Sequence, residues 1–293
     1  MSKTSPLDHN QIRRIAITAV FSDDYFFEKV VLKGGNALSL ALGISGRSSL
    51  DLDFSIENDF DDVAEAERRL RTALERRFAT VGLVVFDFSF GSRPFTPREC
   101  EPRWGGYVAD FKLMEQERYK RIGDDKRACA RESLVVGPRQ HRKFTIELSK
   151  FEYTKGKLAR EIDNFEIYVY APEMIAIEKL RAICQQMPQY PLNRTPCARA
   201  RDFFDIHLIV SETDANLASA DNKDLLGHIF GAKDVPLNLL QLIAEQREFH
   251  RPDWDSVRLS IAQDSLEEFD FYFDFVLGQV ALLKAFGDVE SPV

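Results

Sequence analysis

Residues 50–56, LDLDFSI, alternate between apolar and polar side chains. Successive side chains of a strand point to opposite faces, so this pattern predicts a β-strand with an apolar face and a polar face. Asp51 and Asp53 then leave the polar face together, with Cα atoms roughly 6–7 Å apart. The apolar face consists of Leu50, Leu52, Phe54 and Ile56.

The periodicity changes near Pro172. Before it, helices are predicted at about 8–21 and 60–79, a short packed helix at NALSLALGI, and strands at GLVVFDFSF, GYVADFKLM, 143–151 and 165–170. After it, helical spacing continues through PEMIAIEKLRAICQQ, 198–211, 222–231, 236–250 and 264–286. We therefore predict an α+β fold, with a mixed sheet domain at 1–170 and an α-helical domain at 171–293.

Composition excludes several classes of protein. The net charge of -8 argues against a protein that coats nucleic acid by bulk charge. The four cysteines form no CxxC pair, and the five histidines show no metal-ligand spacing, so a structural zinc site is not expected. No apolar stretch is long enough to span a membrane and no signal-peptide core begins the sequence. We expect a cytoplasmic protein with no membrane partner.

Gly34 and Gly35 follow an apolar segment and precede the predicted short helix. Glycine allows backbone N–H groups to approach an anion closely, and a helix N-terminus favours phosphate. This turn is therefore a candidate phosphate site, and the alternative is a plain tight turn. The P-loop and dinucleotide-binding patterns are both absent from it.

The two aspartates suggest a divalent cation. Neighbouring carboxylates repel one another, and hard oxygen ligands suit Mg²⁺, which removes that repulsion. The D-x-D pattern alone is common, since it also occurs at Asp59/Asp61 and Asp253/Asp255. The context of Asp51 and Asp53, an alternating strand after a glycine pair, distinguishes them from a solvated polar face.

Four motifs, in this order, resemble the AbiEii/AbiGii-type toxin nucleotidyltransferases of the polymerase-β-like nucleotidyltransferase superfamily. They are LKGGNAL at 32–38, RSSLDLD at 47–53, EKLRA at 178–182 and RARDFFDI at 199–206. Asn36 stands where the family usually has Ser or Thr. The resemblance implies a polymerase-β-like sheet domain followed by helices, and a toxin controlled by a cognate antitoxin protein.

The resemblance also implies roles for individual residues. Asp51 and Asp53 would bind Mg²⁺ or Mn²⁺, Lys179 would contact the triphosphate, and Asp202 would complete the catalytic site. The nucleotide-binding residues would be Lys33, Gly34, Gly35, Asn36, Arg47 and Ser49, together with Lys179. The alternative for the RARDFFDI segment is a structural ion-pair cluster among the helices.

Enzymes of this superfamily usually carry a third carboxylate on a neighbouring strand, which binds metal or acts as general base. Glu147, on the polar face of KFTIELS, is the first choice for this catalytic and metal-binding role. Asp87 and Asp110 lie on other predicted strands and remain alternatives.

The acceptor is suggested by a basic segment. Residues 118–143 contain nine Lys or Arg against three Asp or Glu, a local balance of about +6. Such a segment can contact an RNA backbone, with Tyr119 and His141 available for base stacking, or it can be a loop that pairs with the acidic helix at 60–69. Because the family is associated with nucleotide transfer to RNA such as tRNA, we predict nucleotide transfer from an NTP to an RNA acceptor. The alternatives are a small-molecule or protein acceptor, and a non-catalytic nucleotide-binding or interaction module.

Overall fold

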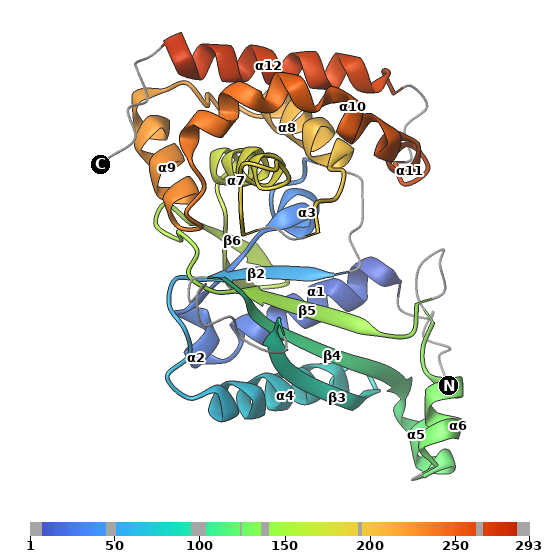
Figure 1. Ribbon diagram of the computed structural model, residues 1–293. Helices are drawn as coiled ribbons and strands as arrows, with labels where there is room; N and C mark the ends of the chain where they lie inside the picture. The colour runs from blue at the N-terminus through green and yellow to red at the C-terminus, as the bar shows by residue number, and fades with distance from the viewer. Residues whose placement is uncertain are drawn as a thin grey trace. The chain divides into compact units, whose positions relative to one another are not determined.

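The computed structural model describes residues 8–44, 51–94, 104–123, 125–135, 141–192, 195–261 and 266–285. The chain divides into two compact units. The sheet unit comprises Met1–Ala41 and Ser48–Val169, and the helical unit comprises Leu42–Arg47 and Tyr170–Val293. A mixed sheet and a set of helices confirm the predicted α+β class (Figure 1).

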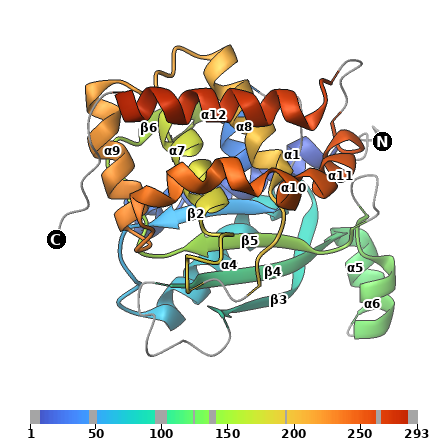
Figure 2. The same cartoon turned by 45° about the horizontal axis from the view of Figure 1, so that its top comes forward.

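Seven strands form one sheet in the described part of the chain, in the order β3-β4-β5-β2-β1-β7-β6. Strands β1 and β7 pair in parallel, as do β2 and β5, and the other neighbours are antiparallel. Figure 2 shows β2, β5, β4 and β3 side by side. The strands are β1 (Val30–Leu32), β2 (Leu52–Ile56), β3 (Leu83–Arg93), β4 (Gly106–Glu115), β5 (Phe144–Ser149), β6 (Leu158–Ile162) and β7 (Phe165–Val169).

One face of the sheet is apolar and packs against helices α1 (His9–Phe21) and α4 (Val63–Ala79). Phe21 of α1 lies 6.0 Å from Phe54 of β2, and Phe78 of α4 lies 5.8 Å from Phe111 of β4, measured between ring centres. The fully buried alternate positions of β2 and β5 belong to this face. The polar positions, including Asp53, therefore lie on the opposite face.

Capping side chains explain where the two long helices begin. Asp8 and Gln11 form a reciprocal capping box at the start of α1, and Asp62 accepts a hydrogen bond from the backbone N–H of Glu65 at the start of α4. The short helix predicted after the glycines is a three-residue α-helix, α3 (Gly34–Asn36), continued by a π-helical turn, η1 (Ala37–Ala41).

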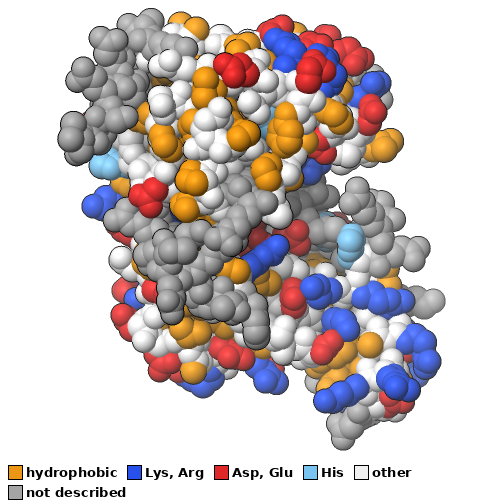
Figure 3. All heavy atoms as spheres, in the orientation of Figure 1, with side chains coloured by type: hydrophobic (Ala, Val, Ile, Leu, Met, Phe, Trp, Pro, Cys, Tyr) orange, Lys and Arg blue, Asp and Glu red, His pale blue; other side chains and the backbone are white. Residues whose placement is uncertain are grey.

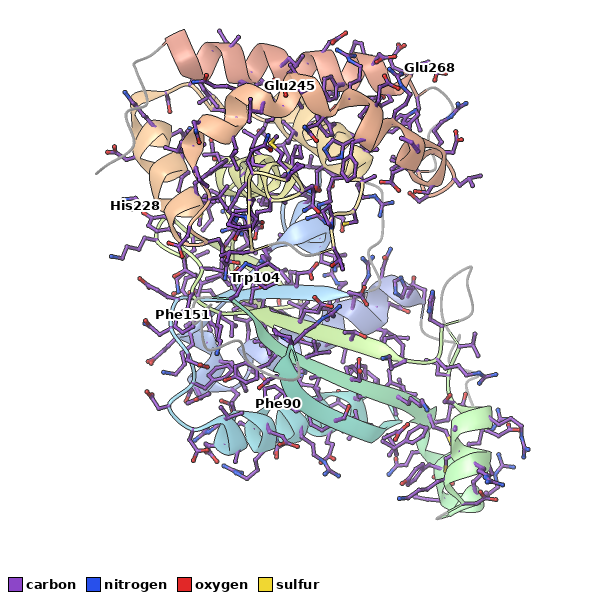
Figure 4. All side chains as sticks on the ribbon, in the orientation of Figure 1. Phe90, Trp104, Phe151, His228, Glu245 and Glu268 are labelled. Carbon is purple, nitrogen blue, oxygen red and sulfur yellow. The ribbon has the colours of Figure 1, made fainter. Side chains whose placement is uncertain are left out.

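The edge strand β3 contains a β-bulge, because Asp87 and Phe88 together face the single residue Phe111 of β4. Asp87 has a φ of 51°, and its carboxylate lies 2.7 Å from the Lys112 ammonium. Beyond the bulge, Phe90, which Figure 4 labels, stacks on Tyr107 with ring centres 5.2 Å apart.

The remaining helices of the sheet unit are short, and the sequence pattern did not predict them. They are α2 (Asp24–Phe27), α5 (Gln116–Ile122) and α6 (Lys126–Glu132). Helices α5 and α6 pack against each other beside β4, and the figures show them beyond the end of the sheet (Figures 1 and 2).

The helical unit is built around α7 and α8, which pack against each other. An aromatic cluster centred on Phe203 of α8, which stacks on Phe273 at 5.0 Å, joins α8 to α12. The elements are α7 (Pro172–Cys184), α8 (Ala200–Glu212), α9 (Ala220–Gly231), η2 (Leu237–Gln246), α10 (Arg247–His250), η3 (Arg251–Asp253), α11 (Trp254–Arg258) and α12 (Phe269–Ala285). The predicted helix at 236–250 is helical from Leu237 to His250, as the 3₁₀-helix η2 followed by the α-helix α10. No helix of the described residues is both long and apolar enough to cross a membrane.

Candidate functional site

The Gly-Gly turn lies directly against Asp53. The backbone N–H of Lys33 donates to the Asp53 carbonyl at 2.9 Å, where β1 ends beside β2. Gly34 has a φ of +67°, and a Cβ atom at this position would lie only 2.9 Å from Oδ2 of Asp53. Glycine therefore satisfies two requirements here, a left-handed backbone and the close approach of a carboxylate.

Asn36 is completely buried, at 0% exposure. Its Oδ1 accepts a hydrogen bond from Nη1 of Arg13 at 2.5 Å, and its Nδ2 donates to the backbone carbonyl of Asp51 at 2.6 Å. Both ends of this amide are thus engaged inside the protein. Arg13 was not predicted as part of this region, because an arginine on an amphipathic helix is ordinarily a surface residue.

Asp51 is exposed and immediately precedes β2, whereas Asp53 lies within it. Glu147 of the parallel strand β5 is in register with Asp53, so both side chains leave the polar face from adjacent strands. Nη1 of Arg93, at the end of β3, lies 2.6 Å from Oε1 of Glu147. The sheet therefore brings two predicted carboxylates together and adds an arginine beside them.

The other two candidates for the third carboxylate lie farther from β2. Asp110 is on β4, one strand beyond Glu147, and accepts hydrogen bonds at 2.9 Å from Thr145 and from Lys143. Asp87 lies in the bulge of the edge strand β3 and pairs with Lys112. Of the three, Glu147 is the one on the strand next to Asp53.

Lys33 is almost buried, with its side chain 11% exposed and its ammonium 3.7 Å from the buried carboxylate of Glu152. Gly35 lies within the short helix α3. Arg47 and Ser49 lie outside the described residues.

Lys179 belongs to a buried charge cluster in the helical unit. Its Nζ lies 2.9 Å from Oδ1 of Asp202 and 2.6 Å from Oδ2 of Asp205, and its side chain is 13% exposed. Burial alone would lower the pKa of Lys179, but the charges of Asp202 and Asp205 outweigh it and raise the pKa. Burial likewise opposes the ionised form of Asp202, yet Arg199 and Lys179 hold its pKa below the ordinary value. Lys179 and Asp202 therefore stay charged at neutral pH.

Arg199 and His250 complete this cluster. Nε of Arg199 lies 2.9 Å from Oδ2 of Asp202, one turn into α8. The backbone N–H of Arg199 donates to Nδ1 of His250 at 3.0 Å, and His250 is 0% exposed. Burial lowers the pKa of His250 to about 4, with Asp202 opposing this shift, so the imidazole is neutral. His250 lies 48 positions beyond Asp202, and nothing in the local sequence indicates this contact.

Comparison with known proteins identifies the family. The family model described as "Nucleotidyl transferase AbiEii toxin, Type IV TA system" matches residues 15–275. The chain belongs to the AbiEii nucleotidyltransferase toxin family. This confirms the resemblance that the four motifs suggested, all of which lie within the matched region.

No curated protein matches this AbiEii family member significantly. Among solved structures, JHP933 from Helicobacter pylori is 17% identical, with a TM-score of 0.48 over 95% of this chain and 91% of that chain. An antigenic nucleotidyltransferase-like protein from Paracoccidioides brasiliensis is 16% identical, with a TM-score of 0.38 over 88% of this chain and 96% of that one.

A nucleotidyltransferase of the AbiEii family is expected to use an NTP and a divalent metal. In the described part of the chain, no group of three or more His, Cys, Asp or Glu side chains is arranged to hold a metal ion. The donors on the polar face nevertheless have suitable chemistry, because Asp53 and Glu147 are carboxylates on neighbouring strands and Asp51 precedes one of them. These oxygens fit Mg²⁺ or Mn²⁺ better than a soft metal.

The basic segment of this AbiEii protein forms most of α5, all of α6 and the residues that lead up to β5. Residues 124 and 136–140 lie outside the described residues. Arg118 pairs with Glu132, within the segment itself. Lys126 and Arg127 are exposed and have no acidic partner among the described residues. Figure 3 shows Lys and Arg side chains gathered over these two helices. The alternative pairing with the acidic helix at 60–69 is not found among the described ion pairs.

Proposed function

We propose that this protein is a metal-dependent nucleotidyltransferase that transfers a nucleoside monophosphate from an NTP to a hydroxyl of an RNA acceptor and releases pyrophosphate. The observation that supports this most directly is the contact of the Asp53 carboxylate with the Gly34 turn. In this reaction a carboxylate that holds a cation must lie close to the backbone that holds the phosphates.

In the proposed mechanism, Asp51, Asp53 and Glu147 would hold the divalent cation, which would neutralise phosphate charge. Gly34 and Gly35 leave room for phosphate oxygens beside the backbone N–H groups of the turn. The acceptor hydroxyl attacks the α-phosphorus in line, the bond from that phosphorus to the bridging oxygen breaks, and pyrophosphate departs. Glu147 takes the hydroxyl proton on a carboxylate oxygen.

Lys179 and Asp202 are proposed to serve the same reaction, Lys179 by contacting the triphosphate. Two carboxylates already hold the Lys179 ammonium, at 2.9 and 2.6 Å. A lysine that meets phosphate in this setting keeps its charge, because its pKa is raised. Removing Lys179 would take the ammonium away from two buried carboxylates. Breaking a buried ion pair in this way typically costs about 3–5 kcal/mol of stability. A loss of activity in a Lys179 variant therefore has to be separated from a loss of folding.

The RNA acceptor is proposed to contact the exposed face of α5 and α6. Lys126 and Arg127 lie in the first turn of α6 and have no acidic partner among the described residues. Unpaired surface cations release counterions when they meet phosphates, which is the main source of sequence-independent RNA affinity. Membership of a toxin family further supports a toxic product and a cognate antitoxin partner. A tRNA 3′ end is one acceptor that fits this chemistry.

The test is incubation of the purified protein with each labelled NTP, Mg²⁺ or Mn²⁺, and total RNA. We expect label to enter RNA, and Asp53→Asn to abolish both label transfer and metal-dependent NTP binding measured by calorimetry. Asp61→Asn, in the second D-x-D pair on the exposed surface, is the matched control and should behave as wild type. Absence of label from RNA with every NTP and metal would overturn the proposal of transfer to RNA. Label found in protein or in a small molecule would identify that molecule, and not RNA, as the acceptor.

A further inference from the structure

Arg13 is a buried cation beneath the Gly-Gly turn. It lies in the middle of α1 and is only 2% exposed. Its guanidinium donates to Oδ1 of Asn36 at 2.5 Å and also to Oδ1 of Asn10. Burial lowers the pKa of Arg13 to about 10, so it remains charged at neutral pH. A charged group in such a position needs firm hydrogen-bond acceptors, and Asn36 is one of them.

The Asn36 side chain also contacts the residue that precedes β2. Its Nδ2 donates to the carbonyl of Asp51 at 2.6 Å, so one amide connects helix α1 with the residue before β2. An amide side chain can accept at one end and donate at the other, whereas a serine hydroxyl is shorter and has a single proton. Asn at this position therefore suits a protein that has Arg13 behind it.

Asp51 depends on such a contact because it lies outside the strand ladder. The antiparallel pairing of β2 with β1 ends at Phe54 and Leu32, and the parallel pairing with β5 begins at Leu52. Asp53, in contrast, lies within the ladder and also accepts from the Lys33 N–H. The two aspartates are thus fixed by different means, one by the sheet and one by a side chain.

We propose that Arg13 and Asn36 are positioning residues that hold the backbone at Asp51, so that its carboxylate can share a cation with that of Asp53. This inference rests on the proposed function. It assigns no phosphate contact to the Asn36 side chain, since the amide is completely buried and both its ends are engaged.

The test is a cycle of Arg13→Met, Asn36→Ser and the double variant, all in the full chain. Binding of Mn²⁺ with a nonhydrolysable NTP is measured by calorimetry, well below each unfolding midpoint. Removing a residue that orients a metal ligand typically weakens metal affinity by about tenfold or more. We expect each single variant to lose about tenfold in affinity. The double variant should lose little more than either, because each single change already breaks the chain of hydrogen bonds from Arg13 through Asn36 to Asp51.

Arg14→Met is the matched control, since Arg14 follows Arg13 but pairs at the surface with Asp163. It should bind like wild type, and Arg13→Lys, which keeps a cationic donor, should recover part of the loss. If the Met variant does not fold, Arg13→Lys and Asn36→Ser still form the comparison. Wild-type affinity in both of these would overturn the positioning role alone. Failure of the wild-type protein itself to bind Mn²⁺ and NTP would overturn the proposed function and, with it, this inference.

Discussion

At the scale of single residues, Gly34 couples the chain conformation to the candidate site. A φ of +67° strains any residue with a Cβ, and at Gly34 that Cβ would also press on the Asp53 carboxylate. Gly82 has a similar φ of +74° but has nothing within 4 Å of its hypothetical Cβ. A substitution at Gly82 therefore reports backbone strain alone, whereas the same substitution at Gly34 reports backbone strain together with contact with Asp53.

We predict that Gly34→Ala and Gly82→Ala each lower the free energy of unfolding by about 1–2 kcal/mol, from the left-handed backbone alone. Gly34→Ala should in addition displace the Asp53 carboxylate and weaken metal-dependent NTP binding at least tenfold. Gly82→Ala should bind as wild type. Chemical denaturation and calorimetry measure the two effects, and equal NTP affinity in the two variants would refute the contact.

From the sequence, individual candidate residues could be chosen more readily than the residues that they contact in the fold. The D-x-D alternation and the glycine pair led to Asp53 and Gly34 as candidates, and these two residues lie against each other in the structure. The register that sets Glu147 beside Asp53, and the burial of the Asn36 amide, depend on which strands and helices meet. Such contacts join positions far apart in the chain, so a local pattern does not contain them.

At the scale of elements, the start of α8 is held from outside the helix. Arg199 is its N-cap residue and has no side-chain cap, while His250 accepts the Arg199 N–H. The imidazole must be neutral to accept this bond on Nδ1. Burial keeps the pKa of His250 at about 4, with Asp202 and Asp253 raising it and Arg199 lowering it in smaller measure.

This arrangement predicts a pH-dependent stability. His250 has an ordinary pKa of 6.5 and a folded pKa of about 4, so the unfolded chain binds the proton first as pH falls. The contribution of neutral His250 to the free energy of unfolding should therefore be fully present above about pH 6.5. It should decline by about 3 kcal/mol as the pH falls to 4. His250→Asn, whose Oδ1 can accept the same N–H, lacks the titration.

The measurement compares wild type with His250→Asn by chemical denaturation at several pH values. Burial also lowers the pKa of His9 to about 4, but His9 is present in both proteins, so its contribution cancels in the difference. The stability advantage of wild type should shrink by about 3 kcal/mol between pH 7 and pH 4. A constant difference over this range would show that His250 titrates normally.

The elements themselves were predictable where one face is buried. β2 and β5 followed from alternation, and α1 and α4 followed from helical spacing. β6 was not predicted, because most of its residues, LAREI, are exposed and its apolar residues do not alternate with polar ones. The segment LNLLQLIAEQ has helical spacing yet winds as a 3₁₀-helix, a tighter turn that the apolar pattern does not distinguish from an α-helix.

At the scale of the whole molecule, the proposed RNA acceptor would have to be bound through a local surface, because the protein as a whole is acidic. The net charge is -8, so distant charges repel a polyanion while the exposed face of α5 and α6 attracts it. RNA affinity should accordingly fall steeply with added salt, because each phosphate contact in a single strand contributes a slope of about -0.7 to the logarithmic plot.

We predict that the double change Lys126→Glu and Arg127→Glu lowers RNA affinity at least fivefold at low salt and makes this slope shallower by about 1–1.5. The matched control is Arg71→Glu with Arg76→Glu, which alters the net charge equally on the exposed surface of α4. Filter binding at several NaCl concentrations measures both quantities. Equal losses in the two double variants would mean that net charge, rather than this surface, governs binding.

The irregular edge strand has a consequence for self-association. β3 is an outermost strand of the described sheet. A long, regular edge strand is a template to which a second polypeptide can add its own strand. The extra residue at Asp87 bends that edge and interrupts its regular row of amides, and the Asp87–Lys112 ion pair adds charge there. The strand that extends the sheet is thereby protected from seeding fibrils through its free side.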